Sequence, residues 1–169
     1  MEIKSCQPTQ AQAYLELCAQ IDAQTPYMML EAGERALQAP DLQAGLTTML
    51  SNDDQRIFLA WEAVRPMAYI NISRKPFNRV QHVFYLVLGV LRSHWGRGIG
   101  TALLEHAEDW AVSVGGTRLE LNVMEHNQRA ITLYQRLGFT QEGCRKNSMW
   151  VSGEYVNELY MAKLCGAGV

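Results

Sequence analysis

Long apolar runs are absent from this sequence, as are paired cysteines. Without a stretch of about 20 apolar residues, we expect no membrane span. The opening MEIKSCQPTQ lacks a basic segment followed by an apolar one, so we expect no secretory signal. Because no CxxC pair occurs, we expect no zinc site of paired thiolates and no disulfide framework. The same absence favours a reduced, cytoplasmic compartment. The cysteines stand apart at Cys6, Cys18, Cys144 and Cys165.

A surplus of basic charge is also missing. Fifteen Lys and Arg face seventeen Asp and Glu, for a formal net charge of −2. A protein that binds nucleic acid by bulk charge would show a basic excess, so we predict no nucleic-acid partner. The four histidines form no HExxH pattern, and we expect no bound metal.

Apolar side chains are plentiful, at 48% of 169 residues. A chain of this length buries on the order of 70% of its extended surface, so it needs no disulfide or metal to fold. The length also falls within the roughly 100–200 residues of one domain. Since no repeat or change of composition marks a boundary, we predict a single domain over residues 1–169.

Hydrophobic periodicity predicts an alternation of helices and strands. Helical spacing occurs over 9–24 with Thr9 as N-cap, over 34–50 with an interruption at Pro40, over 98–114 and over 127–136. Strands are expected at 2–6, 56–63, 67–74, 81–91, 117–123, 139–150 and 155–164, with a bulge at Gly89. This order predicts an α+β fold, in which helices cover a mixed sheet on both faces.

The most informative pattern is Gly96-x-Gly98-x-Gly100, which lies between an apolar strand and a helix. The first N–H groups of a helix have no internal partner and attract anions, and glycines let a phosphate approach the backbone. A P-loop needs a lysine that is absent here, and a dinucleotide fingerprint needs the different spacing GxGxxG. A phosphate site and a plain tight turn with helix-packing glycines both fit the pattern.

The glycine turn resembles motif A of the GNAT superfamily of N-acetyltransferases. In that motif a strand is followed by Arg or Gln, two residues, a glycine, one residue and a small residue. Gly98 and Gly100 match the small positions, whereas Trp95 stands where Arg or Gln is usual. The segment 127–139, with Asn127, Tyr134 and the pair Gly138-Phe139, resembles motif B, and 153–161 resembles the last hairpin of many members. Together the resemblance covers about residues 56–164.

The resemblance implies the GNAT fold, whose mixed, mostly antiparallel twisted sheet of six to seven strands carries about four helices on both faces. It also implies acetyl transfer from acetyl-CoA to a primary amine of a small molecule or a protein N-terminus, by direct attack in a ternary complex. The amine acceptor stays open. The alternative is a non-catalytic acyl-CoA sensor or interaction module on the same fold. Many members form homodimers, so a homodimer is compatible with the resemblance.

Acetyl-CoA offers a pyrophosphate, a peptide-like pantetheine arm and a thioester. We expect Leu88, Gly89 and Val90 to pair with the arm as a strand would, and an N–H near Val90 or Leu91 to face the thioester oxygen. In the family, Asn127 contacts the arm, which agrees with a role as helix cap. The backbone N–H groups that suit the pyrophosphate are those of Gly96, Arg97, Gly98, Ile99, Gly100 and Thr101.

Tyr134 matches the family position of the acid that assists departure of the thiolate, and its alternative role is a core aromatic on the helix. An amine acceptor must be neutral to attack, whereas a lysine-like amine has a pKa of about 10.4. A base or a water chain is therefore needed. Asn122 stands where some relatives have a glutamate, which leaves as candidate bases Glu120, Glu125, His126 and Tyr85.

Three arginines and one loop complete the candidate site. Arg92, Arg97 and Arg129 could reach cofactor phosphates as forked donors, although a solvated surface charge is the simpler interpretation of each. The loop from Thr25 to Met29 lies between the first two helices, where relatives shape the acceptor pocket. Core packing is an equal alternative for its Tyr27 and two methionines.

Overall fold

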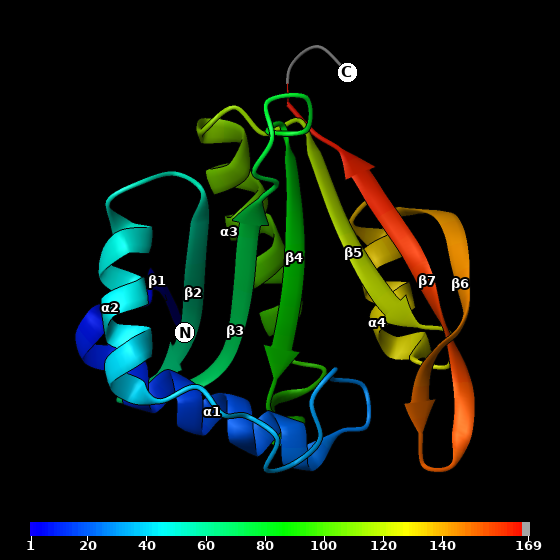
Figure 1. The fold of residues 1–169 in the computed structure, drawn as a ribbon, viewed down its shortest axis with the longest axis horizontal. Helices are drawn as coiled ribbons and strands as arrows, with labels where there is room; N and C mark the ends of the chain where they lie inside the picture. The colour runs from blue at the N-terminus through cyan, green and yellow to red at the C-terminus, as the bar shows by residue number, and fades with distance from the viewer. Residues whose placement is uncertain (167–169) are drawn as a thin grey trace.

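Seven strands form one sheet in the computed structural model, which describes residues 1–166, and their order is β1-β2-β3-β4-β5-β7-β6 (Figure 1). All neighbouring strands pair antiparallel except β4 and β5, which are parallel. The predicted mixed, mostly antiparallel sheet is therefore confirmed. The strands are β1 (Glu2–Ser5), β2 (Gln55–Glu62), β3 (Arg65–Arg74), β4 (Val83–Val90), β5 (Arg118–Met124), β6 (Thr140–Val151) and β7 (Glu154–Leu164).

Helices cover both faces of the sheet, as expected. On one face lie α1 (Ala11–Gln24) and α2 (Ala39–Leu50), and on the other α3 (Ile99–Ser113) and α4 (Gln128–Arg136) (Figure 1). Because strand side chains alternate between faces, Leu59 packs under α1 and α2 whereas Phe58 packs under α3. Within residues 1–166, no helix is long and apolar enough to cross a membrane.

The first two helices begin later than predicted. A 3₁₀ turn, η1 (Pro8–Gln10), precedes α1, so Gln10 rather than Thr9 is the N-cap. Residues 34–38 are not helical, and Pro40 lies in the first turn of α2 instead of interrupting a longer helix. A first-turn N–H has no partner within the helix, so proline is tolerated there.

β4 runs past Gly89 without the predicted bulge. Its register with β3 is regular from Phe84 to Val90. A Cβ at Gly89 would lie 2.5 Å from Cε1 of Tyr69, so glycine makes room here for a ring on the neighbouring strand. An irregularity of register occurs instead between β2 and β3, at Ala60 and Trp61.

The parallel strands β4 and β5 separate part-way along their length. Val83–Tyr85 pairs with Arg118–Glu120, and beyond these residues the two strands diverge (Figure 1). β5 continues alongside β7 as far as the pair Met124 and Glu158. The sheet therefore opens at its centre.

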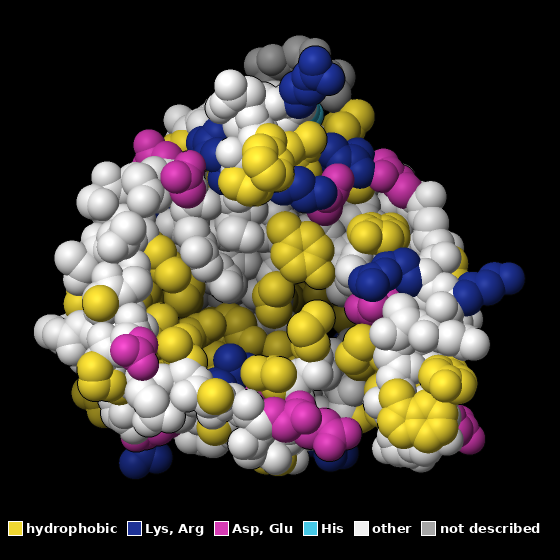
Figure 2. Space-filling view, viewed as in Figure 1, with side chains coloured by type: hydrophobic (Ala, Val, Ile, Leu, Met, Phe, Trp, Pro, Cys, Tyr) yellow, Lys and Arg dark blue, Asp and Glu magenta, His cyan; other side chains and the backbone are white. Residues whose placement is uncertain are grey.

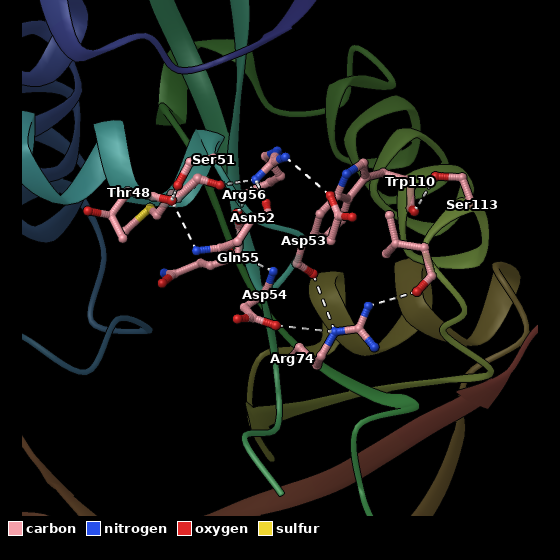
Figure 3. A network of polar contacts seen from close by, with 12 residues as sticks. Thr48, Ser51, Asn52, Asp53, Asp54, Gln55, Arg56, Arg74, Trp110 and Ser113 are labelled. Carbon is pink, nitrogen blue, oxygen red and sulfur yellow. Dashed lines mark hydrogen bonds and ion pairs between the residues drawn. The ribbon is translucent and has the colours of Figure 1, made fainter. Parts of the chain in front are cut away.

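Two arginines brace the closed end of this opening. Arg56 donates to the backbone oxygens of Met49 and Asn52, and its guanidinium carbon lies 5.3 Å from the ring centroid of Trp110. Arg74, at the end of β3, donates from Nη2 to the carbonyl oxygen of Val114 at 2.7 Å (Figure 3). Arg74 Nε also donates to the carbonyl oxygen of Asp53 at 3.3 Å, so these contacts join the turn before β2 to β3 and α3.

Candidate active site

A cavity of about 970 Å³ occupies the opening between β4 and β5. Its walls include residues of α3 and α4 on one face of the sheet and of the α1–α2 loop on the other, so it passes through the sheet. Figure 2 looks onto the α1–α2 face and shows a hollow with an apolar floor. Of the predicted catalytic and cofactor-binding residues, all but Arg97 line the cavity: Leu88, Gly89, Val90, Gly96, Gly98, Ile99, Gly100, Thr101, Asn127 and Tyr134.

The amino end of α3 faces this cavity with free backbone donors. Gly98 is the N-cap, and its φ of +76° belongs to the left-handed region that favours glycine. The first helical bond runs from the N–H of Ala102 to the carbonyl of Gly98 at 3.1 Å. The N–H groups of Ile99, Gly100 and Thr101 therefore have no partner within α3, and no side chain caps them.

Two basic side chains of α4 line the same cavity. Arg129 and Arg136 line the cavity from α4, where a separation of seven residues puts them on nearly one face. Arg136 was not predicted, although this spacing was a usable signal. Arg97 instead bonds Glu62 at 2.6 Å, outside the cavity wall. We call the turn Gly96–Thr101, together with the two α4 arginines of the cavity wall, the phosphate end, after the ligand that the sequence predicts for the turn.

The edge of β4 that faces the opening has free backbone groups. The N–H of Leu91 donates to the carbonyl of Met67 in β3 at 3.0 Å, so this predicted donor is already engaged. Residues alternate in the side to which their backbone groups point, which turns Leu88 and Val90 toward the opening. β5 offers them no partner there. The Val90 carbonyl accepts from Trp95 Nε1 at 2.8 Å, leaving its N–H available.

α4 presents two predicted residues to the cavity. Asn127 caps the helix, because its Oδ1 accepts from the N–H of Ala130 at 3.2 Å. The ring of Tyr134 packs against Phe139, with a centroid distance of 5.8 Å. Burial raises the pKa of Tyr134, and the neighbouring Tyr85 raises it further, with no hydrogen bond from residues 1–166 acting on the hydroxyl. The phenol is therefore protonated at neutral pH and can donate into the cavity.

Two of the four predicted bases do not line the cavity. Glu120 lies 2.6 Å from Lys75 Nζ and 2.8 Å from Arg118 Nε. Burial alone would raise the pKa of Glu120, but hydrogen bonds from these two cations outweigh it and lower the pKa overall. Glu125 accepts a bond from Asn157 Nδ2 at 3.0 Å. Both carboxylates therefore make structural contacts outside the cavity wall.

The other two predicted bases, His126 and Tyr85, do line the cavity. The His126 ring lies 5.2 Å from the ring centroid of Tyr27 in the α1–α2 loop. Burial raises the pKa of Tyr85, and the negative charge of Glu158 raises it further. A phenol with a raised pKa keeps its proton at neutral pH, so Tyr85 is a hydrogen-bond donor rather than a base.

Glu158 lines the cavity and was missed by the sequence analysis. It lies on β7 with 8% of its surface exposed, and its Oε2 accepts from Arg145 Nη1 at 3.1 Å. Among the described residues of the cavity wall it is the sole Asp or Glu. Its position follows from the pairing of β7 with β5, and this pairing cannot be predicted from a local sequence pattern. We call Tyr27–Met29, Met149 and Glu158 the acceptor end.

Comparison with known proteins settles the family. Residues 19–139 match the model of the acetyltransferase (GNAT) family. The chain belongs to this family. The GNAT acetyltransferase of Streptococcus pneumoniae has a similar structure, with a TM-score of 0.93 and 28% identity over 97% of this chain and 99% of that one. yncA of Salmonella typhimurium, solved with its cofactor acetyl-CoA, has a TM-score of 0.84 at 18% identity, over 97% and 93% of the two chains.

Curated GNAT relatives match over shorter segments. L-amino acid N-acetyltransferase AaaT of Escherichia coli is 36% identical over 77 residues, 43% of this chain and 46% of that protein. Streptothricin acetyltransferase of Streptomyces lavendulae is 34% identical over 116 residues, 66% of this chain and 59% of that protein. The match therefore spans roughly half the length of each relative.

Trp95 remains the departure of this GNAT chain from the usual motif. Its indole N–H is engaged by the Val90 carbonyl, and the guanidinium carbon of Arg129 lies 5.0 Å from the centroid of its ring. A long polar side chain is thus replaced by an aromatic one that braces the turn and supports an arginine of the phosphate end.

Proposed function

We propose that this protein transfers an acetyl group from acetyl-CoA to a primary amine by direct attack in a ternary complex. The observation that carries the proposal is the cavity itself, which joins the uncapped end of α3 on one face of the sheet to a buried carboxylate on the other. Two comparisons support it: yncA was solved with acetyl-CoA on the same fold, and AaaT is an N-acetyltransferase by name.

The residues present fit acetyl-CoA along its length. The N–H groups of Ile99–Thr101 and the two arginines of the phosphate end suit a pyrophosphate. Leu88 and Val90 offer a free strand edge to the pantetheine arm. Acetyl-CoA supplies an acetyl group activated as a thioester. The protonated hydroxyl of Tyr134 donates to the sulfur as it departs.

A non-catalytic acyl-CoA sensor would use the same phosphate end. Such a sensor needs neither a proton donor nor a carboxylate on the cavity wall. The presence of both Tyr134 and Glu158 on the cavity wall therefore favours an enzyme.

Two measurements test the proposal. Calorimetry with acetyl-CoA should show saturable binding, and a screen of primary amines with acetyl-CoA should release free thiol. Binding without thiol release for any amine would indicate the sensor. Absence of acetyl-CoA binding in the folded protein would overturn both functions.

A further inference from the structure

The acceptor end holds one carboxylate, that of Glu158. Glu158 is paired in register with Met124 of β5 and Arg145 of β6, and 8% of its surface is exposed. Arg145 bonds its Oε2, and no hydrogen bond from residues 1–166 reaches its Oε1. A buried carboxylate with a free oxygen on a cavity wall suits an ammonium group, because charged hydrogen bonds are the strong ones.

The residues that line the cavity with Glu158 on the α1–α2 side are mainly apolar or aromatic, with polar exceptions such as Asn122 and His126. Tyr27 and Met28 come from the α1–α2 loop, Met149 from β6, and Tyr85 from β4. Methionine side chains adapt to irregular apolar shapes. This wall favours a ligand whose body is apolar.

Within residues 1–166, the wall of this cavity carries few other charged or titratable groups. His126 lies beside Tyr27, and Asp22 and Glu31 line an adjoining, smaller cavity that shares the loop methionines. The Arg and Lys residues of the cavity wall within 1–166 are Arg129 and Arg136, and both belong to the phosphate end. Arg145 points its Nη1 at Glu158 and does not line the cavity. A carboxylate on the acceptor would therefore find no matching cation among the acceptor-end residues, and a second ammonium would find no second carboxylate on the wall of this cavity.

We propose that Glu158 binds the amino group of the acceptor and accepts its proton, and that the acceptor is a primary monoamine with an apolar body. The inference rests on the proposed function. The acceptor arrives as an ammonium ion and loses one proton to water. As the neutral nitrogen bonds the acetyl carbon and the carbon–sulfur bond breaks, its second proton passes to Glu158. The sulfur takes the proton of Tyr134. Tyr134 regains a proton from solvent and Glu158 releases its own.

Three amines test the acceptor class by calorimetry on the full chain at pH 7. Phenethylamine is a monoamine with an apolar body, L-phenylalanine adds a carboxylate to that body, and spermidine adds further ammonium groups. We expect phenethylamine to bind at least tenfold more tightly than either of the others. Tighter binding of L-phenylalanine or spermidine would overturn the proposed class.

Variants test the carboxylate. Glu158→Gln should weaken phenethylamine binding roughly 10- to 100-fold, the range of a charged hydrogen bond. Glu154→Gln, on an exposed residue of the same strand, should change nothing. Unaltered phenethylamine affinity in a folded Glu158→Gln variant would overturn the role. If that variant does not fold, Glu158→Asp replaces it; the shorter side chain withdraws the carboxylate, and unaltered affinity there counts against the role equally.

Arg145→Met separates recognition from support of the fold. Both Arg145→Met and Glu158→Gln break the ion pair, but only the latter removes the carboxylate. The Arg145 side chain is 46% exposed, so its loss should be tolerated and phenethylamine binding should persist. An equal loss of affinity in both variants would mean that the pair is structural, contrary to the inference.

Thiol release separates this inference from the proposed function. With acetyl-CoA and phenethylamine, wild type should release thiol and Glu158→Gln should release it at least tenfold more slowly. Binding that depends on Glu158 without any thiol release would overturn acetyl transfer and leave the amine site standing. Equal kcat/KM in the two proteins would leave acetyl transfer standing and overturn the role of Glu158.

Discussion

The two ends of the cavity are built from different materials. The phosphate end consists mainly of backbone N–H groups in one short stretch, Gly96–Thr101, with arginines from one helix. The acceptor end consists of side chains from the α1–α2 loop, β6 and β7, far apart in the chain. A backbone site depends on the turn geometry that glycines permit, whereas a side-chain site depends on how distant strands pair. The backbone site can therefore stay constant while the side-chain site changes with the acceptor.

Tyr134 lines the cavity together with residues of both ends, and the loss of its hydroxyl should have the largest effect. Tyr134→Phe keeps the packing against Phe139 and deletes the hydroxyl. General acid assistance contributes about 10²–10⁴-fold, so kcat on the best acceptor should fall by that factor. Acetyl-CoA affinity and thermal stability should change little, because the buried ring is kept.

The matched control is Tyr155→Phe, at a tyrosine that is 65% exposed and outside the cavity wall. It should have wild-type kcat. A Tyr134→Phe enzyme with near-normal kcat, where chemistry limits the rate, would show that Tyr134 is a packing residue only.

An ion pair holds the loop that contributes Tyr27–Met29 to the acceptor end. Arg35 donates from Nε and Nη2 to the carboxylate of Asp22 at 3.0 and 3.2 Å, and the Asp22 side chain is 1% exposed. This pair fastens the α1–α2 loop to α1. Arg35→Met leaves a buried charge without its partner and should cost about 1–3 kcal/mol of unfolding free energy, measured by urea denaturation.

The same Arg35→Met variant sharpens the comparison of the two ends. KM for the acceptor should rise while acetyl-CoA affinity stays unchanged. Arg65→Met, at an exposed arginine where β3 begins, should leave both quantities and the stability unaltered. Equal weakening of both substrates would show that the loop supports the whole cavity.

The phosphate end can be predicted from the sequence because its signals are local. A glycine turn between a strand and an amphipathic helix limits the structures available, and Asn127 caps a short helix as its position suggested. Strand and helix order also sufficed for the mixed sheet. Helix starts were less certain, since Pro40 can either interrupt a helix or open one.

Only part of the acceptor end could be predicted: the family resemblance indicated the loop from Thr25 to Met29, which does line the cavity, but nothing in the sequence indicated Met149 or Glu158. Glu158 reaches the cavity because β7 pairs with β5 and because β4 has diverged from β5. Neither fact is written in a local pattern. Glu120 shows the opposite error, a residue predicted for the site that lies outside it. Its ion pairs with Lys75 and Arg118 could not be predicted from sequence spacing.

Glycines at the two ends of α3 allow a test of the phosphate end alone. Gly98 at its start and Gly115 beyond its end have φ values of +76° and +87°, and a Cβ at either would meet open space. Alanine at either position should therefore lower the free energy of unfolding by a similar amount, about 1–2 kcal/mol, which is the penalty for an L-residue in the left-handed region.

Gly98→Ala alone should weaken acetyl-CoA binding, on the order of tenfold or about 1.4 kcal/mol, because its methyl crowds the approach to the helix end. Calorimetry on both variants measures this difference. Equal affinities would place the pyrophosphate elsewhere.

The smallest effect concerns Glu120, the carboxylate that its strand position suggested as a base. Its two cations lower its folded pKa below the ordinary 4.5. A depressed carboxyl pKa stabilises the fold above the unfolded value, and this contribution is lost as pH falls through the folded value. Glu120→Gln should therefore cost under about 1 kcal/mol at pH 7, as partly exposed ion pairs do. It should also lose less stability than wild type between pH 7 and pH 3, as urea denaturation at each pH would show.

Because Glu120 does not line the cavity, kcat and the acceptor KM should stay unchanged in Glu120→Gln. A large fall in kcat with an unaltered fold would instead make Glu120 the base and move the proton acceptor from β7 to β5.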